Sequence, residues 1–246
     1  MEQRKRVLTF LTFFICTACL AFLTASLATH KWIVAKPIRI TLFNTSMSTS
    51  GAANETVGDS DLDSGKFRGE IHFGLFHGTK VLNYGFGDRI TGIWMKQELA
   101  KNPNFMAFGL WLFTVLCVAI AMVFGIVSSV FSIINTVMTP IEIITGIQGL
   151  FLWNGLAALF CLCGGISWLL QYKNSLRRNV LTPDEQNDGW NSEGRAWLGF
   201  SYFFVIIALV LYIVNIILVY LANRPVKSRE PRTSTDKNPE GVIMLY

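Results

Sequence analysis

The stretch FMAFGLWLFTVLCVAIAMVFGIVSSVFSIINTVMTPI, from Phe105 to Ile141, carries no charged side chain. A helix needs about 20 mostly apolar residues to cross a hydrocarbon core about 30 Å thick. This stretch is longer than a single crossing requires, so we expect its helix to end near Ile134. The sequence therefore predicts a membrane-spanning helix over residues 105–134.

Three further apolar stretches predict spans over residues 7–29, 147–172 and 196–223. The whole chain is 52% hydrophobic and only 15% charged, whereas a soluble domain carries about 25% charged residues. The first stretch could instead be a signal peptide, but the apolar core of a signal is only about 7–15 residues long, which favours a retained span. The fold predicted is an all-α membrane protein, a bundle of four transmembrane helices.

Basic residues predict how the chain lies in the membrane. Lys and Arg gather in the N-terminal segment 1–6 and in the tail 224–246, and both ends therefore read as cytoplasmic; Lys173, Arg177 and Arg178 oppose this assignment. Residues 135–146 then form a short cytoplasmic loop, and residues 30–104 and 173–195 form extracellular loops. These basic ends explain the net charge of +5 without nucleic-acid binding. The tail contains three prolines and is expected to be disordered.

The long first loop divides into two parts. Residues 44–63 are polar and contain two N-glycosylation triplets, at Asn44 and Asn54. Residues 66–90 contain GEIHFGLFHGTK, in which apolar and other residues alternate from Ile71 to Leu75 as in a strand. We expect a turn at Gly78-Thr79, a returning strand over 81–86, and cover for this small extracellular β-hairpin from a strand at 32–34 or from the helix ends.

Small residues four apart predict close helix contacts within the bundle. Asn154 and Asn215 are the polar side chains expected to point inward and to bond across helices. The three ladders of small residues are Thr17-Ala21-Ala25, Ala121-Gly125-Ser129 and Ala157-Cys161-Gly165.

The sequence gives no indication of a catalytic, metal or ion-transport site. No ionisable side chain lies deep within a predicted span, which argues against a pump and, less strongly, against a channel. All five cysteines fall within spans, so no loop disulfide is expected. His72 and His77 are five apart, which on one strand places them on opposite faces, a poor metal pair. We expect no enzyme activity, no cofactor and no metal.

Several motifs resemble those of the clarins, a family of the claudin-like four-span superfamily. Trp32 stands just after the first span, and FGLFHG contains Gly74, Leu75, Phe76, His77 and Gly78. Asn135, Pro140, Gly146 and Gly149 recur at the clarin spacing and lead into Trp153 and Asn154. Claudins have a GLW motif and two cysteines in the first loop; here Gly74-Leu75-Phe76 stands in its place and the loop cysteines are missing, which fits a divergent, invertebrate-type clarin.

The resemblance implies a non-enzymatic protein that organises actin-linked membrane structures, in relatives those of sensory cells such as the hair cells of hearing. It would lie in the plasma membrane and bind the lipid bilayer, other membrane proteins and cytoskeletal scaffolds, with a homo-oligomer also open. Two alternatives are a claudin-like adhesion or barrier protein and an accessory subunit of a channel.

The C-terminal residues Met244, Leu245 and Tyr246 place apolar side chains at alternate positions before the last carboxylate. A strand added to a PDZ groove needs this arrangement. The alternative interpretation is that these residues are a disordered apolar end without a binding partner.

Overall fold

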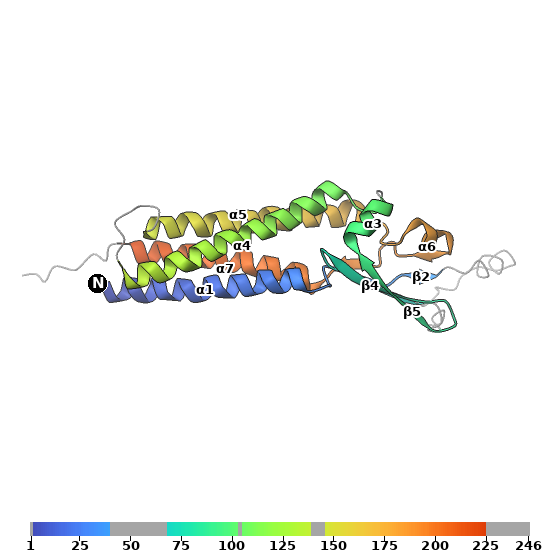
Figure 1. Cartoon of the computed structure of the whole chain (residues 1–246), viewed down its shortest axis with the longest axis horizontal. Helices are drawn as coiled ribbons and strands as arrows, with labels where there is room; N and C mark the ends of the chain where they lie inside the picture. Colours follow the sequence, from blue (N-terminus) through green and yellow to red (C-terminus); the bar gives the residue numbers. More distant parts are fainter. Residues whose placement is uncertain (1, 40–67, 103–104, 139–145, 225–246) are drawn as a thin grey trace, which may run out of the picture.

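The computed structural model describes residues 2–39, 68–102, 105–138 and 146–224. Four helices in this part are long and apolar enough to cross a membrane. They lie along the long axis of the molecule, and α1 begins at the same end of the bundle at which α7 ends (Figure 1). The predicted four-helix membrane bundle is therefore confirmed, with helices α1 (Glu2–Ala28), α4 (Phe108–Val137), α5 (Ile147–Gln171) and α7 (Phe200–Asn223).

Each of these helices packs against two others. Helix α1 contacts α4 and α7, and α5 contacts the same two helices. A single π-helical turn, η1 (Tyr172–Leu176), extends α5 toward the sheet end of the bundle. Many large apolar side chains of these helices are exposed on the outside of the bundle, which suits a surface in contact with lipid.

A five-stranded antiparallel sheet covers one end of the bundle, in the order β5-β4-β3-β1-β7. Both loops that leave this end contribute to it, because β1 pairs with β3 on one side and with β7 on the other. The strands are β1 (Ile33–Ala35), β3 (Gly69–Phe73), β4 (His77–Asn83), β5 (Asp88–Trp94) and β7 (Ala196–Leu198). A second, two-stranded sheet pairs β2 (Ile38–Arg39) with β6 (Trp190–Asn191).

The hairpin predicted over 66–90 is present, but its turn lies elsewhere. Strand β3 ends at Phe73 and β4 begins at His77, so the turn is Gly74–Phe76 and the predicted turn Gly78-Thr79 lies within β4. Gly78 pairs with Phe73 in the ladder, and a glycine there leaves room for the Phe73 side chain. The second bend uses Gly85 and Gly87, whose φ angles of 99° and 116° favour glycine.

Several boundaries differ from those expected. The fourth long helix begins at Phe200 rather than 196, because Ala196–Leu198 pairs with β1 as a strand. Helix α4 continues to Val137, beyond the expected end near Ile134. The two loops also contain short helices that were not predicted, α3 (Met95–Lys101) and α6 (Pro183–Asn187).

We predict that valine at Gly78 or Gly74 will destabilise the sheet and its junction with the bundle. A Cβ at Gly78 would collide with the Phe73 side chain and the His72 carbonyl, and one at Gly74 would lie 2.7 Å from the carbonyl oxygen of Thr29. Overpacking of this kind costs about 1–3 kcal/mol or more. Thermal unfolding in detergent and delivery to the cell surface measure the effect.

Gly92 supplies the matched control, because a Cβ there meets no atom within 4 Å. Gly92→Val lies in the neighbouring strand β5 and should keep both stability and surface delivery. Normal unfolding temperatures for Gly78→Val and Gly74→Val would contradict the packing described here.

Candidate functional site: the sheet junction and the polar layer of the bundle

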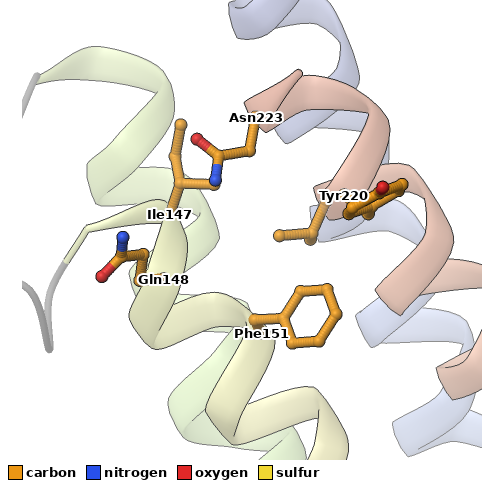
Figure 2. A pocket seen from close by; sticks show the side chains of 6 residues that line it. Ile147, Gln148, Phe151, Tyr220 and Asn223 are labelled. Atoms are coloured by element: carbon orange, nitrogen blue, oxygen red, sulfur yellow. The ribbon is translucent and has the colours of Figure 1, made fainter. Parts of the chain in front are cut away.

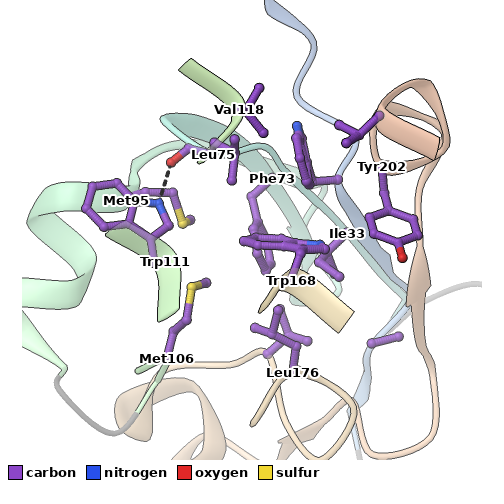
Figure 3. Packing of buried hydrophobic residues seen from close by; sticks show 14 of the residues in the cluster. Ile33, Phe73, Leu75, Met95, Met106, Trp111, Val118, Trp168, Leu176 and Tyr202 are labelled. Atoms are coloured by element: carbon purple, nitrogen blue, oxygen red, sulfur yellow. Dashed lines mark hydrogen bonds between the residues drawn. The ribbon is translucent and has the colours of Figure 1, made fainter. Parts of the chain in front are cut away.

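The turn Gly74–Phe76 is pinned to two helices. The indole N–H of Trp111, on the first turn of α4, donates to the carbonyl of Leu75 at 2.8 Å, as the dashed line in Figure 3 shows. The backbone N–H of Met95, where α3 begins, donates to the carbonyl of Phe76 at 2.9 Å. The FGLFHG motif therefore joins the sheet to the bundle and is a structural junction.

Trp32 joins the same region to three further elements. Its backbone N–H donates to Phe73 (3.0 Å), and its carbonyl accepts from the backbone N–H of Gly199 (2.9 Å). Its indole N–H donates to the carbonyl of Ser26 in α1 at 2.8 Å. The ring is fully buried, and its centroid lies 5.0 Å from that of Trp168 in α5. One side chain and its own peptide groups thus connect α1, β3, α5 and the start of α7.

Histidines His30 and His77 meet where the chain leaves α1. Their ring centroids are 3.8 Å apart, and the His77 ring lies 5.8 Å from that of Trp94. Burial, and then the neighbouring His77, lowers the pKa of His30. The neutral form of His30 is therefore the one that this junction favours.

His72 lies apart from this pair, on β3. Its Nε2 contacts the Glu70 carboxylate at 2.9 Å. The prediction that His72 and His77 lie on opposite faces of one strand was wrong, because His77 begins the next strand and contacts His30. Within the described ranges, no three side chains of His, Cys, Asp or Glu come together as a metal site.

An ion pair that sequence reasoning missed ties the two loops together. The ammonium group of Lys80 on β4 contacts both carboxylate oxygens of Glu185 on α6, at 2.6 and 2.8 Å. Both side chains are largely buried. Glu185 also accepts the backbone N–H of Thr182, completing a capping box at the start of α6. The spacing Thr-Pro-Asp-Glu could have predicted this short helix, whereas nothing in the sequence indicates the partner of Glu185.

A polar layer crosses the middle of the bundle, with one side chain from each long helix. The Asn215 amide donates to Oδ1 of Asn154 at 2.9 Å and to the sulfur of Cys16 at 3.0 Å. The Cys16 sulfur also lies 3.4 Å from the hydroxyl of Ser128. All four side chains are buried. The predicted inward orientation of Asn154 and Asn215 is confirmed, and Cys16 and Ser128 complete the layer.

Two of the predicted small-residue ladders face other helices and one does not. Ala157, Cys161 and Gly165 are buried, as are Ala121 and Gly125. At Gly125 a Cβ would collide with the hydroxyl of Tyr212, so glycine admits that ring from α7. The ladder Thr17-Ala21-Ala25 was wrong: Thr17 and Ala21 are exposed, because α1 turns Cys16, Cys19 and Leu23 inward instead.

The other motif residues lie toward the opposite end of the bundle. Gly146 and Gly149 are buried around the start of α5, and Trp153 stacks on Phe124 with ring centroids 5.8 Å apart. Asn135 donates its side-chain amide to the carbonyl of Phe131. Six motif or modification residues lie outside the described part of the chain: Asn44, Asn54, Pro140, Met244, Leu245 and Tyr246.

Comparison with known proteins matches these features to one family. A family model described as Clarin-2-like matches residues 4–174, which include α1, the hairpin, α4 and α5. The chain belongs to the clarin family. Among clarins, it is similar to mouse Clarin-3, at 24% identity over 100% of both chains. It is also similar to mouse Clarin-2 (34% identity over 42% of this chain and 43% of the relative) and to rat Clarin-1 (25% over 95% and 96%).

Clarin membership and the four apolar helices establish a multi-pass membrane protein. Neither the family description nor the names of these clarins denotes an enzyme. The polar groups of the layer bond to one another and join the four long helices.

We predict that Asn154→Leu will lower the stability of the bundle. The change removes the acceptor of the Asn215 amide inside the membrane and should cost about 1–3 kcal/mol. Unfolding in detergent micelles measures it. Thr17→Val is the control, because the exposed Thr17 hydroxyl bonds only within its own helix, and this change should stay within about 0.5 kcal/mol. Equal stability of the two variants would show that the polar layer does not stabilise the bundle.

We also predict that the sheet junction loses stability in mild acid. The pKa of His30 is lower in the folded chain than its usual value of 6.5. Its contribution to stability is thus fully present above that usual value and is lost as the pH falls through the folded pKa. Unfolding temperatures measured on both sides of the usual pKa should show this slope, and His30→Gln should flatten it. An unchanged slope in His30→Gln would assign the pH dependence to other groups.

Proposed function

We propose that this clarin is a non-enzymatic organiser of the plasma membrane, which shapes actin-linked structures of sensory cells through lateral and cytoplasmic contacts. The observation that carries the proposal is the use of the polar side chains within the bundle. Cys16, Ser128, Asn154 and Asn215 form hydrogen bonds with one another across the four long helices. A transporter or pump instead places ionisable groups along a path through the membrane.

The proposal places the working surfaces on the outside of the molecule. Large apolar side chains, such as Phe113, Val123 and Ile207, cover the perimeter of the helices. These surfaces are available to lipid and to the helices of other membrane proteins. Helices associate in lipid through close packing and not through a hydrophobic drive, so lateral partners would be selected by shape.

We further propose that both chain termini lie in the cytoplasm. Helix α1 begins with the exposed basic residues Arg4, Lys5 and Arg6, and Arg224 follows α7 at the same end of the bundle. An excess of Lys and Arg on one side is typical of the cytoplasmic face. The tail after Arg224 would then be available to cytoskeletal or PDZ scaffolds, and the sheet would face the cell exterior.

A second candidate function, adhesion between cells, draws support from the free edge of the sheet. Among the described residues, strand β5 pairs with β4 alone and lies at the edge of the sheet. Phe86 beside it is fully exposed, and Ile90 and Trp94 are 71% and 63% exposed. An exposed edge strand with apolar side chains is a surface on which another chain can pair.

Proximity labelling in cells with actin-filled protrusions tests the proposal. We expect the full chain, with the labelling enzyme at its N-terminus, to label membrane proteins and actin-linked scaffolds. Removal of residues 225–246 should abolish labelling of the scaffolds while the membrane partners stay. Labelling of neither class, with intact protrusions after loss of the protein, would overturn the proposal.

The double variant Phe86→Ser, Ile90→Asp separates the two functions. Because both side chains are exposed beyond the bundle, the change should leave the scaffold labelling unaltered. Aggregation of non-adherent cells by the wild type, and its loss in the double variant, would instead establish adhesion through the sheet edge.

A further inference from the structure

A cavity of about 240 Å³ lies between α5 and α7 at the end of the bundle opposite the sheet (Figure 2). Phe151 and Ile147 from the first turns of α5 lie on one side of it, and the last turn of α7 lies on the other. The complete lining is Ile147, Gln148, Phe151, Val219, Tyr220 and Asn223.

Polar and apolar groups are separated along the depth of this cavity. The carboxamides of Gln148 and Asn223 lie at its outer end, one near the start of α5 and the other at the end of α7. Phe151 and Tyr220 are each three residues further into the bundle, which on a helix is a depth of about 4.5 Å. The cavity therefore has an amide-lined mouth and an aromatic and aliphatic body.

The two carboxamides at the mouth have no hydrogen-bond partner among the described residues. No side-chain hydrogen bond joins Gln148 or Asn223 to another residue of these ranges, and both are exposed. Each amide offers one donor group and one acceptor. A carboxamide therefore suits a neutral group that both donates and accepts, such as a hydroxyl.

The occupant must come from the membrane. Phe151 and Tyr220 are 43% and 48% exposed on helices that span the bilayer. Their exposed faces therefore meet lipid, and the cavity lies on this lipid-facing perimeter. Its position at a helix end places the mouth near the boundary between hydrocarbon and headgroups, where the polar end of a membrane amphiphile lies.

We propose that this cavity binds the hydroxyl end of a membrane sterol. The hydroxyl would bond with Gln148 and Asn223, and the rigid rings would lie against Phe151 and Val219. A rigid ligand loses less conformational entropy on binding than a flexible acyl chain does. A phospholipid headgroup would need a cation in the cavity, and the six lining residues include none. Arg224, whose guanidinium donates to the Tyr220 hydroxyl at 2.9 Å, is not among them.

The sequence at this position agrees with the assignment. Leu218, Tyr220 and Arg224 match a short pattern proposed for cholesterol contact, Leu or Val followed by Tyr and then by a basic residue. The pattern is common, so the shape and polarity of the cavity carry the proposal. In the structure, the Tyr and the Arg of this pattern, Tyr220 and Arg224, are hydrogen-bonded to each other.

Photolabelling in lipid nanodiscs tests the proposal on the full chain. The probe is a cholesterol analogue with a photoreactive diazirine on its rings, and mass spectrometry locates the labelled peptides. We expect labelling at residues 147–151 and 219–223, and competition by unlabelled cholesterol but not by added phosphatidylcholine or phosphatidylserine. Even labelling around the whole bundle, or equal competition by a phospholipid, would overturn the proposal.

Two variants sharpen the result. Ile147→Trp fills the cavity and should abolish labelling there, whereas Ile213→Trp, on a lipid-facing position of α7 away from the cavity, should not. Gln148→Leu with Asn223→Leu removes both amides from the exposed mouth and should weaken competition by cholesterol about tenfold, the loss of two modest hydrogen bonds. Unchanged competition in this double variant would show that the hydroxyl is not recognised at the mouth.

Discussion

The junction of sheet and bundle depends on Trp32. This residue lies four positions after the end of α1, and its two backbone groups bond to Phe73 on one side and to Gly199 on the other. Its indole N–H is bonded to the last turns of α1, and its ring packs on Trp168. A Trp in this position is costly to bury unless its N–H finds an acceptor, and the carbonyl of Ser26 supplies one. These bonds set the direction in which the chain leaves α1. The pairing of β1 with its two neighbours and the position of the start of α7 both depend on that direction.

That direction explains why the two loops form one body. Strand β1 begins directly after Trp32. One of its edges pairs with β3 from the first loop, and the other edge pairs with β7 from the second loop. The Lys80–Glu185 ion pair joins the same two loops farther from the membrane. Because the pair is largely buried, loss of one partner would leave an uncompensated charge. All five cysteines lie in the helices as free thiols. The two loops are therefore connected by strand pairing and an ion pair, without a disulfide.

The sequence predicts the local features well and the long-range partners poorly. Four apolar stretches were enough for the bundle, since bilayer thickness sets the required length. Asn154 and Asn215 were expected to point inward because a polar amide in lipid needs a partner, and their mutual bond follows from that rule. The exposed Thr17-Ala21-Ala25 ladder shows the limit: small residues permit contact on a face but do not select the face. The apolar residues 196–198 continue the run of α7 and so predict helix, but they pair with β1 as a strand, and the helix begins only at Phe200. The anchor of Leu75 on Trp111 lies beyond any local pattern, because 36 residues separate the two.

Cys16, Ser128, Asn154 and Asn215 bond to one another inside the bundle, and the surfaces proposed for recognition lie at its two ends. At one end, the edge strand β5 carries exposed apolar side chains at Phe86, Ile90 and Trp94. At the other end, the α5–α7 cavity is lined by the exposed side chains of Phe151 and Tyr220. Helix α7 runs from the sheet end of the bundle to the cavity, since it begins beside Trp32 at Gly199 and ends at the cavity with Asn223. Its middle is held by Tyr212 against Gly125 and by Asn215 in the polar layer, so its two ends keep a fixed relation to each other. A protein built in this way suits a role in placing other molecules relative to the membrane, because the position of each surface is set by the same four helices.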